Sequence, residues 1–286
     1  MNFVPFCGYS LLALPGQWQY FLRERFIEMR IVRSIRSTAA ALAMFAAMPV
    51  LLQAQSRPNL NGPAPRTADG KPDLSGIWDN EHNRSCPGSA CGDLMVSQEF
   101  LNIGANLKGG LPYQPWAAQL VKTRTAANGK DDPVARCLPA GIVHAHTSPL
   151  FRKIVQVPGL VVIMYGYNAM FRQIFTDGRP PVANAEMPAF FGYSSGRWEG
   201  DTLVVETSGF KDEQWLDRNG SPLTDAAKIT ERFRRVNYGK LEIEITINDP
   251  KAYKGPWTVK LNQSLVPNTE LSDYVCLENS PHLIGK

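Results

Sequence analysis

The chain has 286 residues, of which 44% are hydrophobic and 20% are charged, a composition typical of globular proteins. Its formal net charge is +4, but the first 54 residues hold five arginines and two glutamates, so the remainder carries 25 basic and 24 acidic residues. A net charge of +1 gives no electrostatic basis for binding nucleic acid. We therefore expect no nucleic-acid partner and, once the leader described next is removed, no stable membrane insertion.

The N-terminus has the pattern of a cleavable secretion signal. Three arginines precede an apolar run at 39–52, which is short for a membrane span, and the small residue Ala54 follows. We assign 29–54 as the signal peptide and 1–28 as an extension ahead of the true start. A membrane anchor formed by the whole N-terminus is the alternative. The signal predicts a periplasmic or secreted protein.

Four cysteines follow the leader, and an even number in an exported domain indicates disulfides. Three pairings are possible; we expect Cys86 with Cys91 and Cys137 with Cys276. The first pair encloses a short loop, and the second would join the middle of the chain to its end. A metal site is the alternative, but the four-residue spacing between Cys86 and Cys91 is not that of a zinc knuckle. We predict no metal and no cofactor.

The segment 55–72 is rich in proline, glycine and asparagine and is expected to be an extended lead-in. One β-rich domain is predicted over 73–286, with its first strand at 76–78 and a short helix at 116–127 in an otherwise irregular N-terminal part. After residue 150, runs of β-branched and aromatic residues alternate with turn residues. The expected strands are 152–157, 160–167, 170–175, 190–198, 202–207, 228–236, 240–248, 257–264 and 271–276.

Period-two alternation in these strands predicts the fold. Leu241 and Ile243 share a face with the isoleucines that follow them, whereas Lys240 and Glu242 share the other. Such a pattern is typical of an antiparallel meander with one wet face. Closing the meander, or nearly closing it, removes exposed strand edges. We therefore predict a mainly β, lipocalin-like barrel; an open two-sheet sandwich is the alternative.

Glu231 is the strongest candidate for a functional side chain. It shares parity with Ile229 and Phe233 and so points into the barrel, where a carboxylate is costly unless paired. Either it forms a structural pair with Arg172 or Arg197, or it anchors a ligand or acts as a general acid or base. The candidate catalytic set is Glu231, Arg172, Asp177 and Tyr165.

Further candidates could contact a ligand. Tyr165 and Tyr167 lie at the end of an inward-facing row and could line a cavity. His144 and His146, two positions apart on a strand, would place both rings on one face, but no third metal ligand is near in sequence. The chain has no P-loop, dinucleotide fingerprint or nucleophile elbow. The candidate ligand contacts are Tyr167, Arg197, Trp198, Trp215, His144 and His146.

Three runs carry a resemblance: Gly192 to Thr207 (GYSSGRWEGDTLVVET), Arg172 to Arg179 (RQIFTDGR) and Thr230 to Phe233 (TERF). Together with DPVARC at 132–137 and DPKAY at 249–253, they resemble a large family of exported bacterial proteins of unassigned function. The resemblance covers most of 65–279 and implies an exported soluble domain without naming a reaction. A weaker likeness, carried by the G-x-W at 76–78, is to lipocalin-type barrels.

These patterns favour an exported protein that binds a small, largely apolar or aromatic molecule in a barrel cavity. The competing hypothesis is a cofactor-free lyase, isomerase or hydrolase that uses Glu231 with Arg172, Asp177 or Tyr165. A structural envelope protein without a ligand is a third possibility.

Overall fold

The computed structural model describes residues 58–81, 97–182, 186–272 and 274–276. The signal peptide, the extension before it, and Cys86 and Cys91 all lie outside the described residues, so these assignments stay predictions. None of the described helices is long and apolar enough to cross a membrane.

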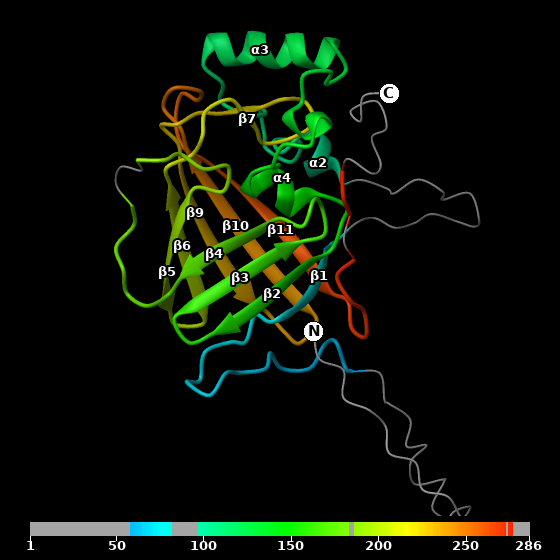
Figure 1. The fold of residues 1–286 in the computed structure, drawn as a ribbon, viewed down its shortest axis with the longest axis vertical. Helices are drawn as coiled ribbons and strands as arrows, with labels where there is room; N and C mark the ends of the chain where they lie inside the picture. The colour runs from blue at the N-terminus through cyan, green and yellow to red at the C-terminus, as the bar shows by residue number, and fades with distance from the viewer. Residues whose placement is uncertain (1–57, 82–96, 183–185, 273, 277–286) are drawn as a thin grey trace, which may run out of the picture. The chain divides into compact units, whose positions relative to one another are not determined.

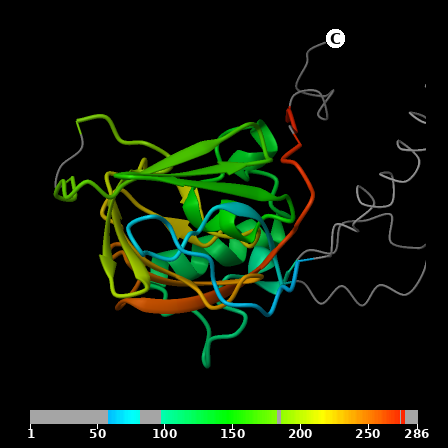
Figure 2. The ribbon, with the colours of Figure 1, turned by 90° about the horizontal axis from the view of Figure 1, so that it is seen from below.

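Nine strands close into a barrel, and their order around it is β1-β11-β10-β9-β6-β5-β4-β3-β2. Figure 1 shows the barrel from the side, and in Figure 2 the strands surround its interior as a ring. The predicted mainly β, closed barrel is confirmed. The strands are β1 (Gly76–Asn80), β2 (Arg152–Val157), β3 (Leu160–Tyr165), β4 (Phe171–Phe175), β5 (Tyr193–Glu199), β6 (Thr202–Ser208), β9 (Lys228–Arg235), β10 (Lys240–Asn248) and β11 (Trp257–Leu265).

One seam departs from the predicted antiparallel meander. β4 and β5 are parallel, and they pair only at Ile174 with Ser194 and at Phe175 with Ser195. Because both strands start at the same end of the barrel, the chain between them is a crossover and not a hairpin. Every other strand pair in the barrel is antiparallel, and most of these have five or more residue pairs. The β4–β5 seam is therefore the weakest join in the barrel wall.

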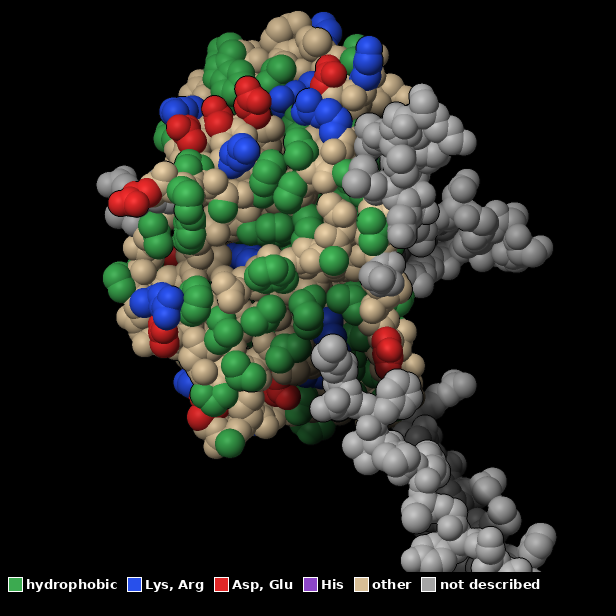
Figure 3. All heavy atoms as spheres, viewed as in Figure 1, with side chains coloured by type: hydrophobic (Ala, Val, Ile, Leu, Met, Phe, Trp, Pro, Cys, Tyr) green, Lys and Arg blue, Asp and Glu red, His purple; other side chains and the backbone are tan. Residues whose placement is uncertain are grey.

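The predicted alternation sets which side chains fill the barrel. The apolar residues of β10 are buried on the inner face, together with Ile229 and Phe233 of β9. The outer face of β10 is polar, as expected. The outer face of β2–β4 is instead largely apolar: Val155 lies opposite Val162, and Met164 lies opposite Phe171. Figure 3 shows hydrophobic side chains gathered over these strands.

Short helices and a two-stranded β-ribbon lie over one end of the barrel, at the top of Figure 1. The predicted helix is confirmed as α3; it begins with proline, which the first turn tolerates, and ends before Asn128, whose φ of 55° is left-handed. The ribbon pairs two strands too short to be predicted from sequence. These elements are α2 (Gln98–Leu101), α3 (Pro115–Ala126), the 3-10 helix η1 (Pro133–Arg136), α4 (Ile142–Thr147), β7 (Gln214–Trp215) and β8 (Pro222–Leu223).

Three predicted strands are wrong or too long. The strand expected at 190–198 begins only at Tyr193. The described part of 271–276 is not a strand and contributes only an isolated bridge between Tyr274 and Tyr167. The strand expected at 160–167 ends at Tyr165, whose N–H donates to the Met170 carbonyl and closes the turn into β4. Tyr167 is therefore beyond the barrel wall and not in the inward row.

The predicted long-range disulfide joins Cys137 to Cys276. It fixes the segment after β11 to η1, near the helices that cover the barrel. The pair is 139 residues apart in sequence, so it restricts the unfolded chain strongly.

Replacing both cysteines by serine should therefore destabilise the fold by about 4–5 kcal/mol, the value expected for closing so long a loop. Urea unfolding of wild type and Cys137→Ser/Cys276→Ser would measure the difference. Peptide mapping without reductant should recover the linked pair. Free thiols at both positions in protein purified from an oxidising compartment would contradict the pairing.

Candidate functional site

A buried ion pair lies at the centre of the candidate site. Glu231 on β9 points inward, as its parity predicted, and its side chain is fully buried. Arg172 on β4 reaches it with two hydrogen bonds, Nη1 to Oε1 at 3.0 Å and Nη2 to Oε2 at 2.5 Å. A bidentate guanidinium–carboxylate pair is the geometry that best offsets the cost of burying both charges. Of the two arginines expected as partners, Arg172 is the one that pairs.

Hydroxyl groups on the intervening strands complete the coordination of Arg172. Its Nε donates to Ser194 Oγ on β5 at 3.0 Å, and its Nη2 donates to Thr207 Oγ1 on β6 at 2.8 Å. The network therefore ties β4, β5, β6 and β9 together inside the barrel. The three motif runs supply all four side chains: RQIFTDGR gives Arg172, the run at 192–207 gives Ser194 and Thr207, and TERF gives Glu231.

His146 joins this network from α4. Its Nε2 lies 2.9 Å from Glu231 Oε1. Burial would raise the pKa of Glu231, but Arg172 and His146 outweigh it and hold that pKa at about 2. Burial also lowers the pKa of His146, so the imidazole is neutral. An ionised carboxylate only accepts hydrogen bonds, so Nε2 carries the proton and Nδ1 presents a lone pair. That Nδ1 is buried and has no hydrogen-bond partner.

The histidine pair does not lie on a strand, which corrects the sequence prediction. His144 and His146 are on helix α4, where positions two apart point to nearly opposite sides. His146 therefore enters the barrel, whereas His144 turns outward and packs against Phe100, with the rings 5.0 Å apart. Burial lowers the pKa of His144 to about 4, and its Nδ1 also lacks a hydrogen-bond partner.

A second buried cation, Arg152 on β2, was not among the sequence candidates. Its Nη1 donates to Asn80 Oδ1 at 2.8 Å, to the His146 carbonyl at 2.7 Å and to Gln263 Oε1. Burial lowers the pKa of Arg152 to about 10. Its shared parity with the buried Ile154 in the strand 152–157 was the signal that could have identified it as inward-facing.

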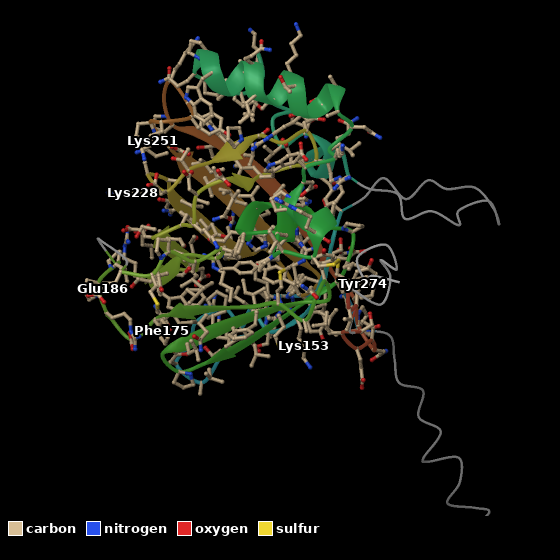
Figure 4. The ribbon with its side chains drawn as sticks, turned by 45° about the horizontal axis from the view of Figure 1, so that its top comes forward. Lys153, Phe175, Glu186, Lys228, Lys251 and Tyr274 are labelled. Atoms are coloured by element: carbon tan, nitrogen blue, oxygen red, sulfur yellow. A yellow bond between two sulfur atoms is a disulfide. The ribbon has the colours of Figure 1, made fainter. Side chains whose placement is uncertain are left out.

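An apolar pocket of about 210 Å³ lies at the edge of the barrel, beside α4 and the ends of β2 and β3. We call it the rim pocket. Tyr165 and His144 both line this predominantly apolar pocket. His144 Nδ1 is buried without a hydrogen-bond partner, and the Tyr165 hydroxyl is buried beside Arg172. Tyr274, which is labelled in Figure 4, lies on its outer side. The lining includes Phe100, His144, Tyr165, Tyr167, Met170 and Tyr274.

The structure brings both predicted tyrosines to the rim pocket, in different roles. The Tyr165 ring is inside the barrel, where it contacts the His146 ring edge-on at 5.8 Å, and burial raises the pKa of its hydroxyl. The Tyr167 hydroxyl donates to the Val134 carbonyl at 2.9 Å, and its ring stacks on Tyr274. Tyr167 is thus a hydrogen-bonded wall residue, whereas the Tyr165 hydroxyl is buried beside Arg172 without a hydrogen bond of good geometry.

Four sequence candidates are not part of this site. Asp177 is exposed in the turn after β4 and pairs with Arg179. Arg197 is exposed on the outside of β5 and pairs with Glu206 at 2.6 Å. Trp198 is half-buried and packs against the apolar core. Trp215 is buried in β7 under Arg124 and lines a separate groove of about 760 Å³.

The arrangement favours binding over acid–base chemistry by Glu231. Its carboxylate is ionised, and Arg172 and His146 occupy it, so it is a weak proton acceptor. Within the described residues, no group of three or more histidine, cysteine, aspartate or glutamate side chains could hold a metal ion. No family model matches the chain, and no curated protein or solved structure matches it either. The resemblance to exported bacterial proteins stays a prediction from the motifs.

Breaking the central ion pair should destabilise the fold. Arg172→Met and Glu231→Gln should each lower the free energy of unfolding by about 3–5 kcal/mol, because each leaves the opposing buried charge unpaired. The double variant should cost much less than the sum, because it removes both charges together. Urea unfolding measures all three. Arg197→Met, in the exposed pair with Glu206, is the matched control and should change stability by less than about 1 kcal/mol. Additive effects at Arg172 and Glu231 would contradict their pairing.

Stability should also fall in mild acid because of His144. The folded-state pKa is about 4 and the ordinary value is 6.5, so the unfolded chain binds the proton more readily. Stability is therefore full above about pH 6.5 and declines by about 3 kcal/mol as the pH falls to about 4. His146 adds a loss of the same sign. Urea unfolding of wild type and His144→Gln at both ends of this window tests the claim: the variant should show the smaller decline, and an equal decline would exclude His144 as a source.

Proposed function

We propose that the protein is exported and binds a small, largely apolar or aromatic molecule in the rim pocket. Export is supported by the signal-like leader and by the disulfide between Cys137 and Cys276, since disulfides persist in oxidising compartments. Binding is supported by the pocket itself, which is concave, apolar and built against a closed barrel.

The observation that carries the proposal is the pairing of an apolar pocket with unsatisfied polar atoms. His144 and Tyr165 line the pocket, and His144 Nδ1 and the Tyr165 hydroxyl are buried within this wall without a hydrogen bond of good geometry. An unsatisfied buried polar group costs about 1–3 kcal/mol, and a ligand that supplies the missing partner recovers that energy. Both side chains are neutral near pH 7, because burial lowers the pKa of His144 and raises that of Tyr165. The preferred ligand is therefore uncharged, with a hydroxyl or similar group on an apolar body.

The volume limits the size of this ligand. About 210 Å³ is below the usual range of about 300–1,000 Å³ for drug-sized ligands, so it suits one aromatic ring with a short substituent. The enzymatic alternative has less support. Glu231 is occupied by its partners, and Asp177 is exposed in a turn outside the network. The His146 Nδ1 lone pair is the group such chemistry would use.

A pocket-filling variant tests this function. Short 4-alkylphenols, at concentrations up to the millimolar range, should raise the melting temperature of wild type, because a ligand that binds only the folded state stabilises it. Met170→Trp fills the rim pocket and should abolish the shift. Val157→Trp adds the same ring to an exposed position on β2 and should leave the shift intact. The proposal fails if no phenol in the series stabilises wild type, or if Met170→Trp responds as wild type does.

A further inference from the structure

The weak β4–β5 seam opens a groove of about 240 Å³ in the barrel wall. The two strands share only two residue pairs, and the first half of β4 lies beside Phe191 and Gly192, which precede β5. We call this the seam groove. Figure 4 labels Phe175 at one end of it, on the opposite side of the barrel from Tyr274 at the rim pocket. Its lining includes Phe171, Arg172, Phe175, Phe191, Tyr193 and Ser194.

The groove runs from an apolar surface to the buried network. Phe171 is 61% exposed and Tyr193 is 37% exposed at its outer edge, next to the apolar outer face of β2–β4. Arg172 and Ser194 lie at its inner side, but their polar groups are already engaged with Glu231 and Thr207. The groove therefore offers apolar contacts and no free charge on its inner side. A hydrocarbon chain fits this chemistry.

A pair of stacked rings connects the lining of the seam groove to the lining of the rim pocket. Phe191 lines the groove, Tyr165 lines the pocket, and the two rings stack with centroids 5.6 Å apart at an interplanar angle of 15°. Tyr165 also carries the buried hydroxyl that, in the proposed function, would hold the polar end of a ligand. A shift of Phe191 away from this stack would join the two spaces beside that hydroxyl.

We propose that the seam groove is a second subsite of the same ligand site and that its occupant is the hydrocarbon tail of an elongated, uncharged amphiphile such as a long-chain alkylphenol. The polar head lies in the rim pocket, and the tail passes Phe191 into the groove. Phe191 is thus the residue that sets how long a ligand the protein accepts. This inference rests on the proposed function of the rim pocket.

A series of 4-alkylphenols with increasing chain length tests the inference by calorimetric titration of the full chain. Each methylene that becomes buried should strengthen binding about fourfold until the available space is filled. Phe191→Ala should move this limit to longer chains and raise the affinity for the longest phenols by about tenfold, while the shortest phenols bind as before. Phe191→Leu should shift the limit in the same direction by less. Phe190→Ala, a neighbouring phenylalanine that packs under Lys211, should behave as wild type.

A substitution at the outer edge gives an independent readout in case Phe191→Ala does not fold. Phe171→Lys replaces an exposed side chain, so the fold is retained, and it should weaken the binding of long phenols without affecting short ones. The inference is overturned if wild type binds short phenols but neither Phe191→Leu nor Phe171→Lys alters the dependence on chain length. If wild type binds no phenol of any length, the proposed function of the rim pocket fails instead.

Discussion

The bidentate pair between Glu231 and Arg172 is the constraint on which the barrel depends. β9 and β4 are separated by β6 and β5, so the pair reaches across the interior and fixes the relation of four strands. Ser194 and Thr207 accept two further hydrogen bonds, so four of the five N–H donors of Arg172 are engaged. A slip of one residue in β9 would turn Glu231 outward and leave Arg172 unpaired. The network therefore specifies register at the seam where the backbone ladder is shortest.

The features that could be predicted from the sequence are those that depend on local patterns. Period-two alternation is a local property, so it gave the inward orientation of Glu231, and the cost of a buried carboxylate predicted an arginine partner without deciding between Arg172 and Arg197. Hairpins joined by short turns, such as β5–β6 and β9–β10, follow from local turn residues. The disulfide followed from cysteine number and separation. These features need no knowledge of distant contacts.

The features that the sequence did not predict depend on tertiary packing. The segment that contains His144 and His146 is short and apolar, and its length suits a strand or a helix turn equally. It becomes helix α4 where it packs over the end of the barrel, which separates the two imidazoles. The parallel pairing of β4 with β5 could not be predicted from the sequence either, because the two strands are joined by a crossover and not by a turn with recognisable residues. Ser194 and Arg197 lie on opposite faces of β5, and the alternation along this strand does not show which face is inside. Only the closed barrel places Ser194 inside and Arg197 outside.

Charged and neutral polar groups serve different purposes inside this barrel. Glu231, Arg172 and Arg152 are held by several hydrogen bonds each, as buried charges must be. Among the buried polar atoms that make no hydrogen bond are Nδ1 of His146 and the hydroxyl of Tyr165, two neutral rings, and also Nε of Arg152. A buried charge without hydrogen bonds costs more free energy of folding than a neutral group without them. The fold can therefore tolerate a neutral polar group that only a ligand would satisfy. The ion pair therefore fixes the barrel wall, and in the proposed function the neutral side chains that line the rim pocket, His144 and Tyr165, would give a ligand its polar contacts.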